Sequence, residues 1–237
     1  MLKEYIYKRK STRKYDMTPL NDAVLNDIKD FAKTITPLFE NIKTEYSFAT
    51  ARDVKNMLLL KAPHYIIISS ENRYGYLPNV GFLFQQMDLY LSSIMLGSCW
   101  LGMAKPTEKL NTTLEFVIIL AFGNSIDTPY RELSEFKRKP LAQISNTAEE
   151  RLEVARLAPS GINAQPWYFV NDGDTIHVYC VKVGMLKAVV YHRLNMIDIG
   201  IALAHVYVSN PSEFAFTVEQ NPPKIKGYSY IGSINNN

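Results

Sequence analysis

The pattern of apolar and polar positions along the chain predicts helices that alternate with short strands. Apolar residues recur at helical spacing after Pro19 and predict a helix whose buried face is Leu20, Val24, Leu25, Ile28, Phe31 and Ala32. Short apolar runs over residues 64–69 and 116–121 are typical of buried strands. The long apolar stretch over residues 80–96 predicts a helix that ends at Gly97.

A similar order of elements starts again after Pro140. In the first part of the chain we also expect short helices over residues 2–8 and 52–60. After Pro140 we expect a helix over residues 147–157, strands over 167–170, 175–181 and 214–219, and a helix from Asn195. Strands that alternate with helices indicate an α/β or α+β layered domain. Residues 79–92 and 195–208 both place an asparagine ahead of a strongly apolar helix, which indicates a weak internal repeat.

The composition is that of an ordinary globular protein. The chain has 237 residues, 47% of them hydrophobic and 21% charged, which suffices for one large domain or two small ones. Two cysteines and four scattered histidines form no disulfide framework and no metal-ligand spacing, so no metal site is expected. Gln85, Gln86 and Asp88 interrupt the longest apolar stretch, which favours a helix buried in protein over a membrane span. The basic N-terminus lacks the apolar core of a signal peptide, and we expect a cytoplasmic protein without a membrane partner.

Basic residues crowd the start of the chain. Against a single Glu4, the first fourteen residues contain Lys3, Lys8, Arg9, Lys10, Arg13 and Lys14. Such a cluster fits a solvated tail, a nucleic-acid-binding arm or a phosphate site. Ser11 and Thr12 favour a phosphate site, because hydroxyls and guanidinium groups together can saturate a dianion. The net charge of +3 is too weak to indicate nucleic acid, and no nucleic-acid-binding module accompanies it.

Residues 158–167 form a polar loop between a predicted helix and a predicted strand. They read Ala-Pro-Ser-Gly-Ile-Asn-Ala-Gln-Pro-Trp. The two prolines fix the backbone, and Gly161 allows close approach of a flat ligand. Ser160, Asn163 and Gln165 offer hydrogen-bonding groups for the edge of such a ligand. Taken alone, the segment also fits a helix end followed by a turn.

Two separate motifs of this chain resemble the FMN-dependent nitroreductase family. Residues 9–16, Arg-Lys-Ser-Thr-Arg-Lys-Tyr-Asp, are similar to its phosphate-binding segment, and residues 158–167 are similar to its cofactor loop. The resemblance implies an α+β nitroreductase-like fold, with a central mixed or antiparallel sheet flanked by helices. It also implies an FMN-dependent oxidoreductase that uses NAD(P)H to reduce nitroaromatics, quinones or similar small acceptors in a ping-pong cycle. Because the flavin carries the electrons, no catalytic side chain is expected. A flavin-binding sensor or carrier without turnover is the alternative.

The resemblance assigns the flavin phosphate and part of the ring to the first half of the chain. Arg9 and Ser11 would bind the phosphate, with the neighbouring Lys10 turned more toward solvent. Arg13 would lie at the N1/O2 edge of the ring, where a fixed cation stabilises the reduced flavin. Residues 136–141 are similar to the family's C-terminal basic segment, so Lys137 or Arg138 would join Arg9 at the phosphate. A solvated run of charges explains that short segment nearly as well.

The same resemblance assigns the remaining ring contacts. Residues 97–102 follow the long helix as in the family, where the backbone N–H groups of Leu101 and Gly102 would face flavin N5. Within the cofactor loop, Ser160 and Asn163 would meet the pyrimidine edge of the ring. The cofactor-binding residues expected from this loop are Pro159, Ser160, Gly161, Asn163 and Gln165.

The spacing of the two motifs departs from that of ordinary family members, which carry both close together in one copy. Here residues 36–41 occupy the place expected for the loop but do not match it, and the matching loop appears only at residue 158. We infer an internal duplication with fusion. Residues 1–145 would form one nitroreductase-like half and residues 146–237 a shortened second half, together making one FMN site. A rearrangement or insertion within one subunit is the alternative, and both a pseudo-dimeric monomer and a homodimer fit.

Overall fold

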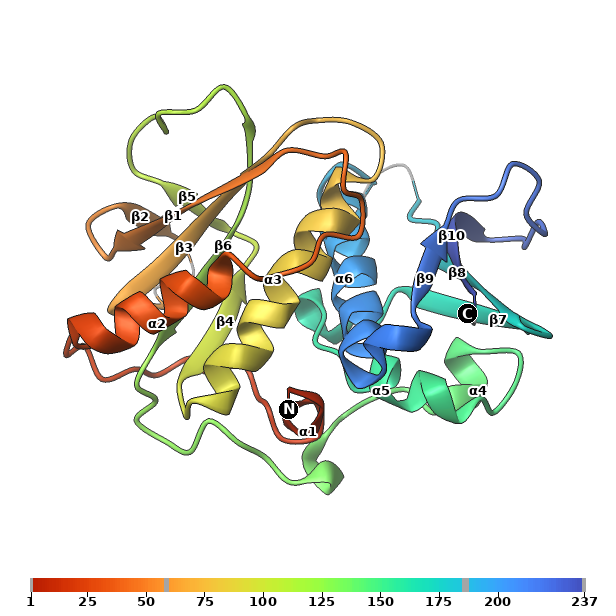
Figure 1. The fold of residues 1–237 in the computed structure, drawn as a ribbon, viewed down its shortest axis with the longest axis horizontal. Coiled ribbons are helices and arrows are strands. Elements are labelled where there is room, and N and C mark those ends of the chain that lie inside the picture. Colours follow the sequence, from red (N-terminus) through yellow and green to blue (C-terminus); the bar gives the residue numbers. More distant parts are fainter. Residues whose placement is uncertain (1, 58–59, 185–187, 236–237) are drawn as a thin grey trace.

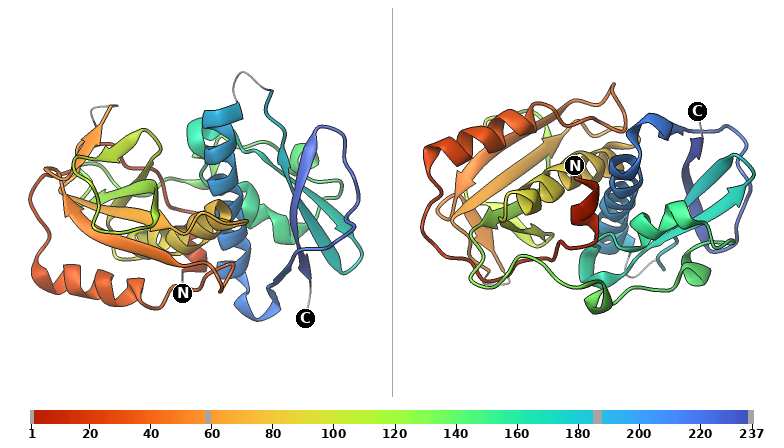
Figure 2. Two further views of the ribbon diagram at one scale, coloured as in Figure 1. Left: turned by 90° about the horizontal axis from the view of Figure 1, so that it is seen from above. Right: turned by 60° about the horizontal axis from the view of Figure 1, so that its bottom comes forward.

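Two four-stranded sheets lie on either side of a central pair of helices in the computed structural model of the protein (Figure 1). The structure describes residues 2–57, 60–184 and 188–235. The central helices are α3, Tyr76–Ser93, and α6, Ala188–Ser209. The views in Figure 2 agree that α3 and α6 run between the sheets. The predicted α+β fold class with antiparallel sheets is confirmed. In place of one central sheet flanked by helices, the structure has two four-stranded sheets, and the helices α3 and α6 lie between them.

The first sheet contains only strands from the first half of the chain. It has the order β1-β3-β6-β4, and every neighbouring pair is antiparallel. Its strands are β1 Thr44–Thr50, β3 His64–Ser70, β4 Gly97–Leu101 and β6 Glu115–Gly123. All residues of β3 are buried, because Ile66 and Ile68 join the main core while Tyr65 and Ile67 join a second, smaller cluster. This burial on both faces explains why β3 is a continuous apolar run in the sequence.

The second sheet repeats the plan of the first with strands from the end of the chain. It has the order β7-β8-β10-β9, again antiparallel throughout. Its strands are β7 Trp167–Asp172, β8 Thr175–Val181, β9 Ala215–Thr217 and β10 Tyr228–Asn235. In both sheets the first two strands in chain order are neighbours, a long helix follows, and the fourth strand lies between the second and the third.

Short helices precede each sheet in the chain. They are α1 Lys3–Ile6 and α2 Asp22–Ala32 before the first sheet, and α4 Leu141–Ile144 and α5 Glu153–Arg156 before the second. The described residues also contain 3-10 turns at Leu133–Glu135, Glu150–Leu152, Gly161–Asn163 and Pro211–Glu213. The predicted helix α2 begins after Asn21, whose side chain accepts a hydrogen bond from Val24 N and so caps the first turn. The helix predicted over residues 147–157 is broken into a 3-10 turn and α5.

The helix predicted over residues 52–60 is wrong. Thr50 donates from both its backbone N and its Oγ1 to Asp53 Oδ2, each at 2.8 Å, and this bonding closes a turn. The chain then enters β2, Val54–Asn56, which pairs with β5, Ala104–Pro106, in a small two-stranded sheet. Residues 58–59 of the predicted helix lie outside the described residues.

The central helices approach each other through two glycines. A Cβ on Gly81 would lie 2.1 Å from Ile197 O, and a Cβ on Gly200 would lie 1.9 Å from Pro78 O. Each glycine thus faces the carbonyl oxygen three residues before the other glycine. Gly81 and Gly200 therefore occupy equivalent positions in the two helices, as do Pro78 and Ile197. Asn79 therefore corresponds to Asp198, three positions beyond the Asn195 suggested by the weak repeat in the sequence.

Replacing either crossing glycine with alanine should destabilise the protein by about 3 kcal/mol, because the methyl group meets a helix backbone that cannot rotate away. Urea unfolding of Gly81→Ala and Gly200→Ala measures this. Gly184→Ala is the control, because no atom of the described residues lies within 4 Å of its Cβ position, so its effect should stay within about 1 kcal/mol. Equal stabilities of all three variants would contradict the close crossing.

Candidate cofactor site

The basic motif at the start of the chain lies against strand β4. Ser11 forms a parallel bridge with Ser98, and Thr12 N donates to Ser98 O at 2.9 Å. Arg9 is only 1% exposed, and its Nε lies 2.9 Å from Asp88 Oδ2. Its Nη2 donates to Ser11 Oγ at 3.2 Å, but its buried Nη1 has no hydrogen-bond partner among the described residues. A buried donor without an acceptor is costly, and an anionic ligand would satisfy it.

Asp88 holds Arg9 within a buried polar network that joins four elements. Its carboxylate accepts hydrogen bonds from Ser98 Oγ and, at 2.8 Å, from Gln85 Nε2. Gln85 Nε2 also lies 3.1 Å from His205 Nε2, while His205 Nδ1 lies 2.9 Å from Val154 O. Burial lowers the pKa of His205 to about 3, so this histidine is neutral and its Nε2 accepts. In the sequence, Asp88 lies inside an apolar helix, and a buried aspartate is almost always paired. Its position is therefore the sequence signal for a buried cationic partner such as Arg9.

A second, partly buried cation, Arg131, joins Arg9 although no sequence motif pointed to it. Arg131 Nε donates to Arg9 O at 3.0 Å, and its guanidinium lies 4.0 Å from the centre of the Phe136 ring. Burial and the positive charge of Arg9 lower the pKa of Arg131 to about 10, with a smaller effect of Arg13. Its terminal nitrogens form no hydrogen bond with the described residues. The site therefore has an excess of positive charge, as phosphate binding requires.

Arg138 connects this cation cluster to the cofactor loop. Its Nε donates to Ala158 O at 3.0 Å, its Nη2 to Leu157 O at 3.3 Å, and its Nη1 to Asn163 Oδ1 at 2.8 Å. Burial and the charges of Arg131 and Arg9 lower the pKa of Arg138 to about 10. The structure thus brings the basic segment and the loop together, and most N–H groups of Arg138 hold the loop.

The polar residues of the loop bond mainly to one another and to its anchors. Gln165 N donates to Ser160 Oγ at 2.9 Å, and Gln165 Oε1 accepts from Lys139 N at 2.7 Å. Three residues that are not glycine have left-handed backbones, with φ of 49° at Ile162, 58° at Asn163 and 48° at Gln165. Such conformations are uncommon, and residues held in them cluster at binding sites.

The segment expected at flavin N5 shares a neighbour with the cofactor loop. Leu101 ends β4 and is buried, and the exposed Gly102 follows it. A Cβ on Gly102 would lie 2.8 Å from Leu194 Cδ2, and one on Gly161 would lie 3.9 Å from Leu194 Cβ and Cδ1. Leu194 of α6 therefore lies next to both segments that the resemblance assigns to the flavin ring. Sequence reasoning missed it, because one leucine in an apolar helix carries no signal.

The remaining predicted residues lie at the margin of the cluster. Arg13 is exposed, and its Nη1 donates to Ser11 O at 3.4 Å. Burial raises the pKa of the Cys99 thiol, and the positive charge of Arg13 partly opposes this rise. Pro159 is buried in the loop. The backbone N of Lys10 donates to Pro129 O at 3.2 Å, and its side chain forms no hydrogen bond or ion pair with the described residues.

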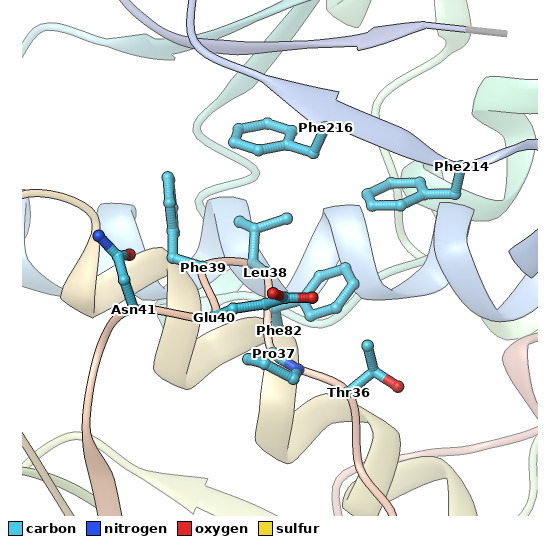
Figure 3. A pocket seen from close by; sticks show the side chains of 9 residues that line it. All are labelled: Thr36, Pro37, Leu38, Phe39, Glu40, Asn41, Phe82, Phe214 and Phe216. Carbon is cyan, nitrogen blue, oxygen red and sulfur yellow. The ribbon is translucent and has the colours of Figure 1, made fainter. Parts of the chain in front are cut away.

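A separate pocket lies in the first half at the place equivalent to the cofactor loop. Residues 36–41 connect α2 to β1, as the cofactor loop connects α5 to β7. A pocket of about 490 Å³ is lined by this segment together with Phe82, Phe214 and Phe216 (Figure 3). Its lining among the described residues includes no lysine or arginine. These residues therefore do not supply the charges that would hold a phosphate.

The chain matches a known family over most of its length. A family model described as "Putative TM nitroreductase" matches residues 1–210. The chain belongs to this nitroreductase family. Membership makes the protein an oxidoreductase. A sequence comparison with curated proteins finds no match.

Solved structures share the fold of this family member. A Thermotoga maritima protein described as "a putative nitroreductase" has a TM-score of 0.68 at 20% identity, covering 99% of this chain and 93% of its own. A nitroreductase family protein of Clostridium difficile has a TM-score of 0.50 at 18% identity. The matched region covers 63% of this chain and 98% of that protein. A Clostridium difficile protein described as an FMN-dependent nitroreductase has a TM-score of 0.46 at 14% identity, with coverages of 59% and 98%.

The part of the chain that the structure describes offers neither a metal cluster nor a membrane span. There, no group of three or more His, Cys, Asp or Glu side chains is arranged to hold a metal ion. No helix within the described ranges is both long and apolar enough to cross a membrane.

Proposed function

We propose that the protein is an FMN-dependent NAD(P)H oxidoreductase that reduces nitroaromatic, quinone or similar small acceptors. The observation that carries this proposal is the contact of the cation cluster with the cofactor loop. Arg138 bonds that loop, and the charges of Arg131 and Arg9 are close enough to lower its pKa. Arg9 Nη1 is a buried donor without a partner among the described residues. A phosphate dianion fits this set of donors.

FMN would supply the two-electron chemistry when bound, and the chain would bind and orient it. Arg9, Ser11, Arg131 and Arg138 would hold the phosphate. Arg13 would stabilise negative charge at the N1/O2 edge of the ring, because a fixed cation acts strongly at a partly dry site. The N–H groups of Leu101 and Gly102 would face N5, and the cofactor loop would border the pyrimidine edge. No side chain is assigned as catalytic, since water can supply the protons.

We further propose that this site is shared by two pseudo-subunits, residues 1–145 and 146–237. The same strand order in both sheets and the reciprocal helix crossing support this division. Residues 36–41 would then be the counterpart of the cofactor loop in a half-site that lacks the basic motif. Each chain would bind one FMN, as a pseudo-dimeric monomer or as one subunit of a homodimer, and would act in the cytoplasm.

The purified protein should contain or take up about one FMN per chain. An absorbance spectrum before and after denaturation measures the ratio, and bleaching by NADH or NADPH separates a reductase from a flavin carrier. Asn163→Ala, in the second half, should weaken FMN binding because Arg138 loses its partner there. A colourless protein that takes up no added FMN would overturn the proposed function.

A further inference from the structure

Asp198 is a buried carboxyl on α6 that contacts the cofactor loop. It is only 4% exposed, and Gly161 N donates to it, with Oδ1 and Oδ2 both at 3.0 Å. Within the described ranges it forms no other hydrogen bond and no ion pair. Its one partner is therefore a backbone N–H of the loop that we assign to the flavin ring.

Neither protonation state of this carboxyl is fully satisfied by the chain. When ionised, its charge is balanced by a single N–H donor; when neutral, its hydroxyl has no acceptor among the described residues. Burial raises the pKa of Asp198 to about 8, and the bond from Gly161 N opposes that rise. The group is thus mainly neutral near pH 7 and becomes ionised in mildly alkaline solution.

The corresponding residue in the other half shows what a loop anchor needs. Asn79 Oδ1 accepts hydrogen bonds from Leu38 N and Phe39 N, both at 2.9 Å. An uncharged amide therefore anchors the loop that precedes β1. Asp198 anchors the loop that precedes β7 with a carboxyl, whose buried charge destabilises the fold. The property that a carboxyl adds over an amide is the ability to bind and release a proton.

We propose that Asp198 is a proton-binding residue of the flavin site, which takes up a proton from solvent when the bound flavin is reduced. The carboxylate and one H⁺ become the carboxylic acid, while a two-electron donor of the nicotinamide class supplies the electrons to the flavin. The negative charge that the reduced ring gains would disfavour a second buried anion beside the loop. This role rests on the proposed function.

The titratable groups near Asp198 are not suited to take up this proton themselves. Cys180 of β8 faces it, and burial together with the Asp198 charge raises the pKa of this thiol to about 12. Cys180 therefore stays neutral. Arg138 and Lys139 hold the same loop through its carbonyl oxygens, such as Ala158 O and Ala164 O. Among the described residues, neither forms an ion pair with Asp198.

The test compares the flavin reduction potential of the wild type and of Asp198→Asn at several pH values. The asparagine copies the anchor of the other half but cannot titrate. Near pH 6.5 both proteins should bind the same number of protons for two electrons. Near pH 9 the wild-type potential should fall with pH about twice as steeply as that of the variant, because one more proton is bound.

Unfolding of the flavin-free proteins supplies a second readout. The free energy of unfolding of the wild type should fall as pH rises from about 4 to about 8, and that of the variant should not.

The outcomes separate this role from the proposed function. A wild-type protein that binds no FMN would overturn both. Wild type and variant that bind FMN equally and show the same slope at every pH would overturn only the role of Asp198. If Asp198→Asn does not fold, the wild type alone decides, because an unchanged slope between about pH 6.5 and about pH 9 also excludes proton uptake by this residue.

Discussion

Replacing Arg138 with alanine should weaken FMN binding by about 100-fold, the equivalent of about 3 kcal/mol. Two effects add. The variant loses a cation of the proposed phosphate site, and it loses the bonds from Arg138 to Leu157 O, Ala158 O and Asn163 Oδ1 that shape the loop. Hydrogen bonds to charged groups contribute about 1.5–3 kcal/mol each, and an unshaped loop must be ordered again on binding. Quenching of FMN fluorescence on titration measures the affinity.

The lysine variant separates charge from geometry at this position. Lys retains the cation but cannot place donors at two backbone carbonyls and an amide oxygen at once. We therefore expect Arg138→Lys to recover little of the lost affinity. Lys137→Ala is the matched control, since the Lys137 side chain is exposed and forms no hydrogen bond or ion pair with the described residues. Full recovery by lysine would show that Arg138 acts on the phosphate by charge alone.

The elements that could be predicted from the sequence are those with a strong local pattern. The apolar runs of β3 and β6 and the long apolar helix α3 were found because each buries nearly all of its residues. Strand β10 was missed, since its Tyr-Ser-Tyr-Ile-Gly-Ser pattern indicates no single buried face. At residues 52–60 the turn closed by Asp53 outweighed the helical pattern, as local side-chain bonding to the backbone often does.

The residues of the candidate site also divide into those with a local sequence signal and those without one. Arg9, Arg138 and the cofactor loop could be predicted because the family keeps recognisable local motifs. Arg131 and Asp198 could not, because their importance comes from neighbours far away in the chain. Arg131 bonds the backbone of Arg9, and Asp198 bonds the backbone of Gly161. Only the folded chain shows that one adds a cation to the cluster and the other places a carboxyl at the loop.

Replacing Asp88 with asparagine should destabilise the protein by about 3–5 kcal/mol, because the buried Arg9 cation then has no counter-charge. Arg9 and Asp88 are 1% and 0% exposed, so water cannot solvate the remaining charge. The bonds from Ser98 and Gln85 to the carboxylate are weakened as well. Urea unfolding of the flavin-free protein measures the loss.

An exposed ion pair of the same chain is the control for Asp88. Lys33 Nζ lies 2.6 Å from Asp30 Oδ1, but both side chains are about 70% exposed. Asp30→Asn should therefore cost less than about 1 kcal/mol. If Asp88→Asn costs no more than Asp30→Asn, the buried ion pair between Arg9 and Asp88 does not stabilise the fold more than an exposed one. Adding Arg9→Met to Asp88→Asn should restore part of the lost stability, since it removes the cation that the first change left unpaired. That recovery would distinguish an uncompensated charge from a simple loss of packing around Asp88.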